Sequence, residues 1–134
     1  MKKLLLLALL CLSFVASKSQ NVTNKTQCAI TVCAICYDPV QCVIFNVCPQ
    51  TMSCVTVFPG ATLPLPTCPQ CQVPPNLIAY TVCWANPACP PPGNCVTVAP
   101  PPSSCFPPLA VLPACSPCPP ANVVFSTTGD LLIQ

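Results

Sequence analysis

The cysteines constrain this chain more than any other feature of its sequence. The chain has 15 cysteines in 134 residues, and Cys11 lies in an apolar segment near the N-terminus. The other 14 make an even number, which in a secreted chain of this size predicts a framework of up to seven disulfides. The spacings do not define which cysteines pair. The 14 are Cys28, Cys33, Cys36, Cys42, Cys48, Cys54, Cys68, Cys71, Cys83, Cys89, Cys95, Cys105, Cys115 and Cys118.

The N-terminal segment predicts a secretory signal peptide. Lys2 and Lys3 precede an unbroken apolar run, residues 4–16, which is too short for a comfortable membrane span. Small residues at the −3 and −1 positions predict cleavage after Ser17 or Ser19, so we assign residues 1–19 to the signal peptide. We therefore expect a secreted, extracellular protein with no membrane span after cleavage. An uncleaved anchor is the alternative.

Charged side chains are almost absent from the rest of the chain. Cleavage after Ser19 leaves Lys25, Asp38 and Asp130, and only 4% of the whole sequence is charged, whereas soluble domains carry about 25%. An apolar protein close to zero net charge tends to associate. The chain has no basic patch for nucleic acid and no polybasic stretch for anionic lipid.

Prolines limit the secondary structure that the chain can form. There are 21 of them, and each removes a backbone donor and restrains φ. A hydrophobic content of 53% is too high for a disordered chain. We therefore expect a small disulfide-rich fold with short β-strands, extended polyproline-like segments and turns, and almost no helix outside the signal peptide.

Two stretches of the sequence resemble each other. CPQTMSCVTVFP (48–59) and CPPPGNCVTVAP (89–100) share C-P-x4-C-V-T-V-x-P at an offset of 41, and V-T-V is typical of a strand. This predicts two imperfect stapled repeats, residues 28–82 and 83–120. The offset of 41 aligns Cys42, Cys48 and Cys54 with Cys83, Cys89 and Cys95, and CPQC (68–71) aligns with CSPC (115–118) at an offset of 47. A competing register aligns TVC at 31–33 with TVC at 81–83.

After the signal peptide, the segments outside the two repeats carry no cysteine. Residues 20–27 are polar, and we expect a flexible N-terminal arm with two N-glycosylation sequons, at Asn21 and Asn24. Unused sequons are the alternative. Residues 121–134 form a strand-like tail whose pieces, 123–127 and 131–133, favour a hairpin. We expect this tail to be mobile and able to add as a strand to a neighbouring copy.

The sequence offers little for catalysis, and we assign no enzyme activity, catalytic residue, cofactor or metal. There is no histidine, and Asp38 and Asp130 are the only carboxylate side chains. Ser103 and Ser104 lack an activating base. The three C-x-x-C pairs favour structural disulfides over zinc or redox chemistry in a secreted protein. The aromatic residues allow either a binding surface or a small core; they are Tyr37, Tyr80 and Trp84.

Two hypotheses for the function remain. The first is a secreted structural protein that self-associates into an extracellular coat, wall or filament, with copies of itself or other extracellular matrix components as partners. It follows from the low charge, the apolar content and the dense cross-links. The alternative is a soluble secreted binding or defence module, such as an inhibitor, a lectin or a toxin-like protein. The first hypothesis predicts polymeric material, and the second predicts a monodisperse monomer.

Overall fold

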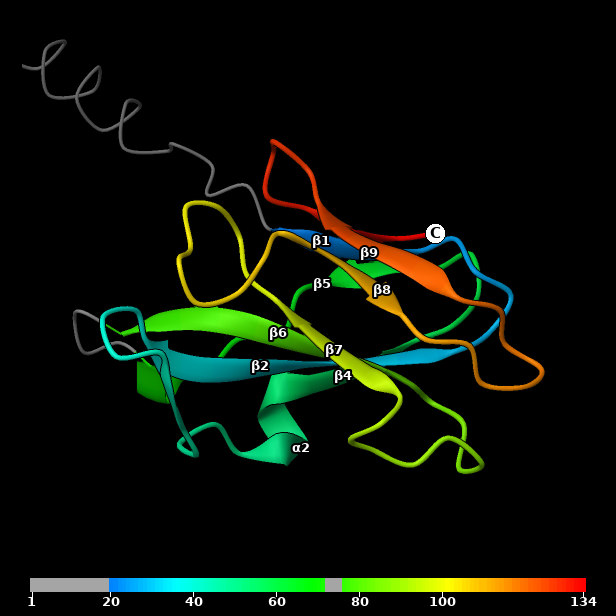
Figure 1. Cartoon of the computed structure of the whole chain (residues 1–134), viewed down its shortest axis with the longest axis horizontal. Coiled ribbons are helices and arrows are strands. Elements are labelled where there is room, and N and C mark those ends of the chain that lie inside the picture. The colour runs from blue at the N-terminus through cyan, green and yellow to red at the C-terminus, as the bar shows by residue number, and fades with distance from the viewer. Residues whose placement is uncertain (1–19, 72–75) are drawn as a thin grey trace, which may run out of the picture.

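The computed structural model describes residues 20–71 and 76–134, in which ten strands form two five-stranded sheets (Figure 1). The assigned signal peptide, 1–19, lies outside these residues. Sheet A has the order β5 (Thr62–Pro64), β1 (Asn21–Asn24), β10 (Leu131–Ile133), β9 (Ala121–Phe125) and β8 (Leu109–Leu112). Sheet B has the order β3 (Val43–Phe45), β2 (Ile30–Asp38), β6 (Leu77–Trp84) and β7 (Cys95–Val98), and β4 (Cys54–Val57) pairs with β2 beside β3.

Helix is confined to two short pieces of the described chain. They are α2 (Gln50–Ser53), which connects β3 to β4, and the 3-10 turn η1 (Pro69–Cys71). The prediction of a small, disulfide-rich, strand-rich fold is therefore confirmed. The polyproline-like segments and the two-unit repeat stay predictions, and the expected boundary at 82/83 falls within β6.

The core lies between the two sheets, which face each other in Figure 1. Alternation along β2 turns Ile30, Val32 and Ala34 inward, as expected for a strand with one buried face. They belong to one cluster with residues of sheet A that include Val123 and Leu131. The chain passes between the sheets after β1, β4, β5 and β7, so each sheet contains strands from distant parts of the sequence.

The expectation of a flexible N-terminal arm is wrong. Residues 21–24 form β1, which lies between β5 and β10 in sheet A. Val22 is fully buried opposite Leu131. The polar composition of the arm is misleading because the second inward position, Asn24, is a buried residue whose amide is fully hydrogen-bonded.

The C-terminal segment forms the predicted hairpin, but it is not a mobile tail. β9 and β10 are antiparallel neighbours, and Gly129 in the connecting turn has a φ of 87°, which favours glycine. β10 lies in the middle of sheet A, and Leu131 and Ile133 are fully buried. Strand pairing with β1 and β9 on its two edges and burial of one face therefore fix β10, in the segment that we expected to be mobile.

The two V-T-V strands occupy equivalent places in sheet B. β4 pairs with the N-terminal half of β2, and β7 pairs with the C-terminal half of β6. β2 and β6 are themselves antiparallel, with Val32 opposite Val82. The four strands are thus related by an approximate twofold rotation about the Val32–Val82 pair. The valines of both V-T-V segments turn to the core, whereas the threonines lie on the outer face.

This symmetry produces an ordered pattern on the outer face of sheet B. Two rows cross the four strands in the order β4, β2, β6, β7, and each joins a threonine pair to a cysteine pair. The first row is Thr56, Thr31, Cys83 and Cys95, and the second is Cys54, Cys33, Thr81 and Thr97. The recurrence of V-T-V therefore has a structural reason, since each copy supplies the outer strand of one half of the sheet.

Candidate functional site

All 14 cysteines of the described chain form disulfides. Five disulfides lie within the expected units, and two join them. Those within the units are Cys33–Cys54, Cys36–Cys71, Cys48–Cys68, Cys83–Cys95 and Cys89–Cys115. Those between the units are Cys28–Cys118 and Cys42–Cys105. The framework ties the loops at the ends of the sandwich as well as the strands of sheet B.

Two of the disulfides cross-link adjacent strands. Cys33 and Cys54 stand directly opposite in β2 and β4 with their Cα atoms 4.0 Å apart. Cys83 and Cys95 stand opposite in β6 and β7 with Cα atoms 4.2 Å apart. The two disulfides occupy equivalent places in the sheet. Their first cysteines, Cys33 and Cys83, are aligned by the competing register of TVC at 31–33 with TVC at 81–83. Their second cysteines, Cys54 and Cys95, are aligned by the offset of 41.

The offset of 41 holds for some cysteines and fails for others. Cys48 and Cys89 align at this offset, and their disulfide partners Cys68 and Cys115 align at the offset of 47. Cys42 and Cys83 align in sequence but not in structure, because Cys42 bonds to Cys105 in a loop, whereas Cys83 is part of a strand pair. Sequence spacing alone could not separate these cases.

Each cysteine of the three C-x-x-C pairs bonds to a partner outside its own pair. Cys68 and Cys71, for example, bond to Cys48 and Cys36. These thiols are therefore not free to bind metal or to exchange within the motif. In the described residues no three side chains of the metal-binding types gather into a site.

Both carboxylates form hydrogen bonds that hold turns. Oδ1 of Asp38 accepts from the backbone N–H of Val40 at 2.7 Å and of Gln41 at 3.2 Å, at the end of β2. Oδ1 of Asp130 accepts from the backbone N–H of Asn21 at 2.9 Å, which links the start of β1 to the turn before β10. The two carboxylates serve different sheets and have structural roles.

Both candidate serines also have structural partners. The Ser103 hydroxyl lies 3.0 Å from the Tyr37 hydroxyl and accepts from the backbone N–H of Phe106 at 3.2 Å. Ser104 Oγ donates to the backbone carbonyl of Pro39 at 3.4 Å. These contacts hold the loop after β7 against the end of β2.

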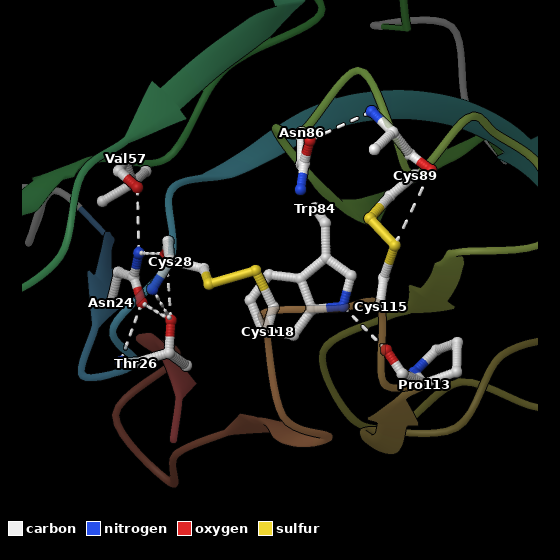
Figure 2. The surroundings of a disulfide bond; sticks show 11 residues. Asn24, Thr26, Cys28, Val57, Trp84, Asn86, Cys89, Pro113, Cys115 and Cys118 are labelled. Atoms are coloured by element: carbon white, nitrogen blue, oxygen red, sulfur yellow. Dashed lines mark hydrogen bonds between the residues drawn. A yellow bond between two sulfur atoms is a disulfide. The ribbon is translucent and has the colours of Figure 1, made fainter.

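Asn24 is the polar centre of the disulfide-linked end of the molecule (Figure 2). Its side chain is fully buried, and Nδ2 donates to the carbonyls of Cys28 at 2.8 Å and Val57 at 2.9 Å. Oδ1 accepts from the backbone N–H and the hydroxyl of Thr26 at 2.9 and 2.7 Å. Both amide hydrogens of Asn24 are therefore used, and a glycan on Nδ2 is incompatible with this fold. Asn21, in the other sequon, is only half-buried.

The aromatic side chains that could have formed a binding surface are buried. Trp84 is 3% exposed, and its Nε1 donates to the carbonyl of Pro113 at 2.7 Å; Figure 2 shows its indole drawn beside the Cys28–Cys118 disulfide. Tyr37 packs edge-on against Phe106 with ring centroids 5.0 Å apart. Tyr80 packs against Phe125, and burial raises the pKa of its hydroxyl above 10.0. These residues stabilise the core.

A hollow of about 430 Å³ lies beside Tyr37 and Tyr80. The prolines after β7, Pro100 to Pro102, form part of its wall. Its lining is largely apolar, and both tyrosines reach it from sheet B. Its size and its apolar, aromatic lining could receive a small ligand.

The most exposed apolar segment lies around β3. All eight residues from 40 to 47 are exposed, and five of them are large and apolar. They are Val40, Val43, Ile44, Phe45 and Val47, with exposures from 36% to 82%. Sequence reasoning did not single out this segment. Its signal is an apolar stretch with no proline and no charge between Pro39 and Pro49.

No family model, curated protein or solved structure matches this chain. In the residues that the structure describes, no helix is long and apolar enough to cross a membrane. A set of seven disulfides is typical of extracellular proteins.

Proposed function

We propose that this chain is a secreted, disulfide-stapled, proline-rich structural protein that self-associates into an extracellular coat, wall or filament. In this role it has no catalytic activity of its own. Its partners are copies of itself or other components of an extracellular matrix.

The observation that carries the proposal is the exposed apolar surface of a protein that has almost no charge. Nine large apolar side chains of the described residues are exposed, and five of them lie within the eight-residue segment 40–47. Only Lys25, Asp38 and Asp130 carry charged side chains after residue 19. Contiguous apolar patches on a surface mark interaction sites, and like-charge repulsion is too weak here to keep copies apart.

The disulfide framework supports the same role. Seven cross-links hold the sandwich in one conformation and lower the entropy of the unfolded chain. A subunit of a coat or filament must keep its shape outside the cell, where no chaperone or reducing system restores it. The framework supplies that resistance in a chain whose core is small.

The alternative, a soluble binding module, has one specific observation in its favour. The hollow beside Tyr37 and Tyr80 is apolar with aromatic and proline walls, as small-ligand sites often are. Such a module would not need the exposed surface at 40–47, which is why we rank it second.

Sizing of the oxidised, secreted protein over a range of concentrations distinguishes the two. A structural protein gives oligomers that grow with concentration, with ordered particles by negative-stain microscopy. Because charge contributes little, added salt should not dissolve them. A monodisperse monomer at every concentration would contradict the proposal and favour the binding module.

A further inference from the structure

The unpaired edge of β3 differs from every other free strand edge of the described chain. β3 pairs with β2 on one side only, and no backbone hydrogen bond outside that pairing involves Val43, Ile44 or Phe45 in the described residues. Its three side chains are exposed at 46%, 52% and 36%. Exposed N–H and C=O groups along such an edge are a template for another strand.

Natural sheets protect edges with proline, charge, bulges or a covering element. The four other strands with one free edge all have proline near them. β5 contains Pro64, and β8 lies between Pro108 and Pro113. β4 and β7 are each followed two residues later by a proline, Pro59 and Pro100. β3 has no proline within three residues and no charged residue within four.

The segment that contains β3 is also held in place before any partner arrives. Cys42, directly before the strand, is bonded to Cys105, and Cys48, three residues after it, is bonded to Cys68. A strand that is already ordered loses little conformational entropy when a second strand pairs with it. Proteins without a partner for such an edge usually leave it short of apolar residues, and this chain does the opposite.

The absence of charge in residues 40–47 indicates which partner pairs with the free edge of β3. A charged partner would bury its charges against residues 40–47 without a counter-charge, whereas a second copy presents the same neutral, apolar strand. Antiparallel pairing about a twofold axis places Ile44 opposite Ile44. It also brings the Val40 end of one copy beside the Val47 end of the other. Only an isologous contact of this kind uses the same patch on both copies.

We propose that two copies of this protein associate through their β3 strands, paired antiparallel with Ile44 at the centre, to join two B sheets into one. This inference rests on the proposed self-association and names its contact. A three-residue strand buries far less than the roughly 800 Å² per partner of a standard stable interface. The contact is therefore weak on its own, and it gains strength where the copies are held in an assembly.

The experiment compares the wild-type protein with Ile44→Lys and Ile44→Glu by sedimentation over a range of concentrations. The exposed position of Ile44 leaves the fold and the seven disulfides intact in both variants. Like charges would face each other across the contact, so each variant alone should associate at least about tenfold more weakly. An equal mixture of the two should recover association, because the introduced lysine of one copy would then face the introduced glutamate of the other. The matched control is Val111→Lys, at an exposed apolar residue of another edge strand, β8 in sheet A.

The outcomes separate the inference from the proposed function. Weaker association of both Ile44 variants, recovery in the mixture and an unchanged control support the β3 contact. If the wild-type protein associates and the Ile44 variants associate equally well, the β3 contact is overturned while self-association stands. If the wild-type protein stays monomeric, both are overturned. If only the chain that keeps its signal peptide associates, residues 4–16 and not a second β3 strand mediate the contact, and the proposed pairing of two copies through β3 is overturned.

Discussion

Val22 in β1 lies directly opposite Leu131 in β10, and the two strands run parallel in the interior of sheet A. Both side chains are fully buried. The first and the last strands of the described chain are therefore neighbours in the interior of the sheet. No disulfide of the described chain involves β1, β9 or β10, so hydrogen bonds and packing alone hold this part of sheet A.

This arrangement predicts that β10 is a major contributor to stability. Leu131→Ala and Ile133→Ala should each lower the free energy of unfolding by about 2–5 kcal/mol, because each leaves a cavity in the core. Leu132→Ala, on the outer face of the same strand, should lower it by less than about 1 kcal/mol. Denaturant unfolding with the disulfides intact measures all three. Equal losses would show that β10 does not pack as the structure has it.

A second prediction concerns the buried amide of Asn24. Asn24→Ala removes the donors to the carbonyls of Cys28 and Val57 and the acceptor for Thr26. Unsatisfied buried groups cost about 1–3 kcal/mol each, so we expect a loss of about 2–4 kcal/mol in the free energy of unfolding. Asn21→Ala is the matched control, because the contact between Asn21 and Asp130 uses the backbone N–H. Loss of stability in the control alone would contradict the role given to Asn24.

Glycosylation gives an independent test of the same geometry. In a eukaryotic secretory host we expect a glycan on Asn21 and none on Asn24 in the folded, oxidised protein, since both Nδ2 hydrogens of Asn24 are donated inside the protein. Enzymatic deglycosylation converts a glycosylated Asn to Asp, and peptide mapping locates the change. Asn21→Gln should then abolish glycosylation completely. A glycan found on Asn24 of the disulfide-bonded product would be inconsistent with the buried amide.

The elements that the sequence predicted well are those with a strong local pattern. V-T-V alternates apolar and polar residues, and both copies are strands with the valines inward. The even number of cysteines predicted up to seven disulfides, and all seven are present. The hairpin at the C-terminus was also visible, because two apolar pieces flank a turn with glycine.

The elements that could not be predicted depend on contacts between distant residues. β1 has only one apolar inward residue, Val22, and becomes a strand because β5 and β10 supply partners on both sides. The burial of Asn24 depends on the carbonyl of Val57, 33 residues away. Disulfide pairing likewise follows the fold, since Cys28 reaches Cys118 across a separation of 90 residues. The edge at β3 was missed because its apolar residues resemble a buried strand until their exposure is known.

The last prediction uses the pKa of Tyr80, which burial raises above the ordinary value of 10.0. Well below pH 10.0 the hydroxyl is neutral in the folded and unfolded states, and its protonation contributes nothing to the pH dependence of stability. Above pH 10.0 the unfolded chain releases the proton while the folded chain keeps it, so unfolding becomes more favourable as the pH rises. Tyr80→Phe removes this effect and keeps every disulfide. Alkaline damage to the disulfides therefore affects the variant and the wild type equally, and it does not change the difference in stability between them. We therefore expect the stability of Tyr80→Phe relative to the wild type to be constant well below pH 10.0 and to increase as the pH rises through and above it. Denaturant midpoints on both sides of that pH measure the difference, and parallel curves across it would mean that burial does not protect the hydroxyl from ionisation.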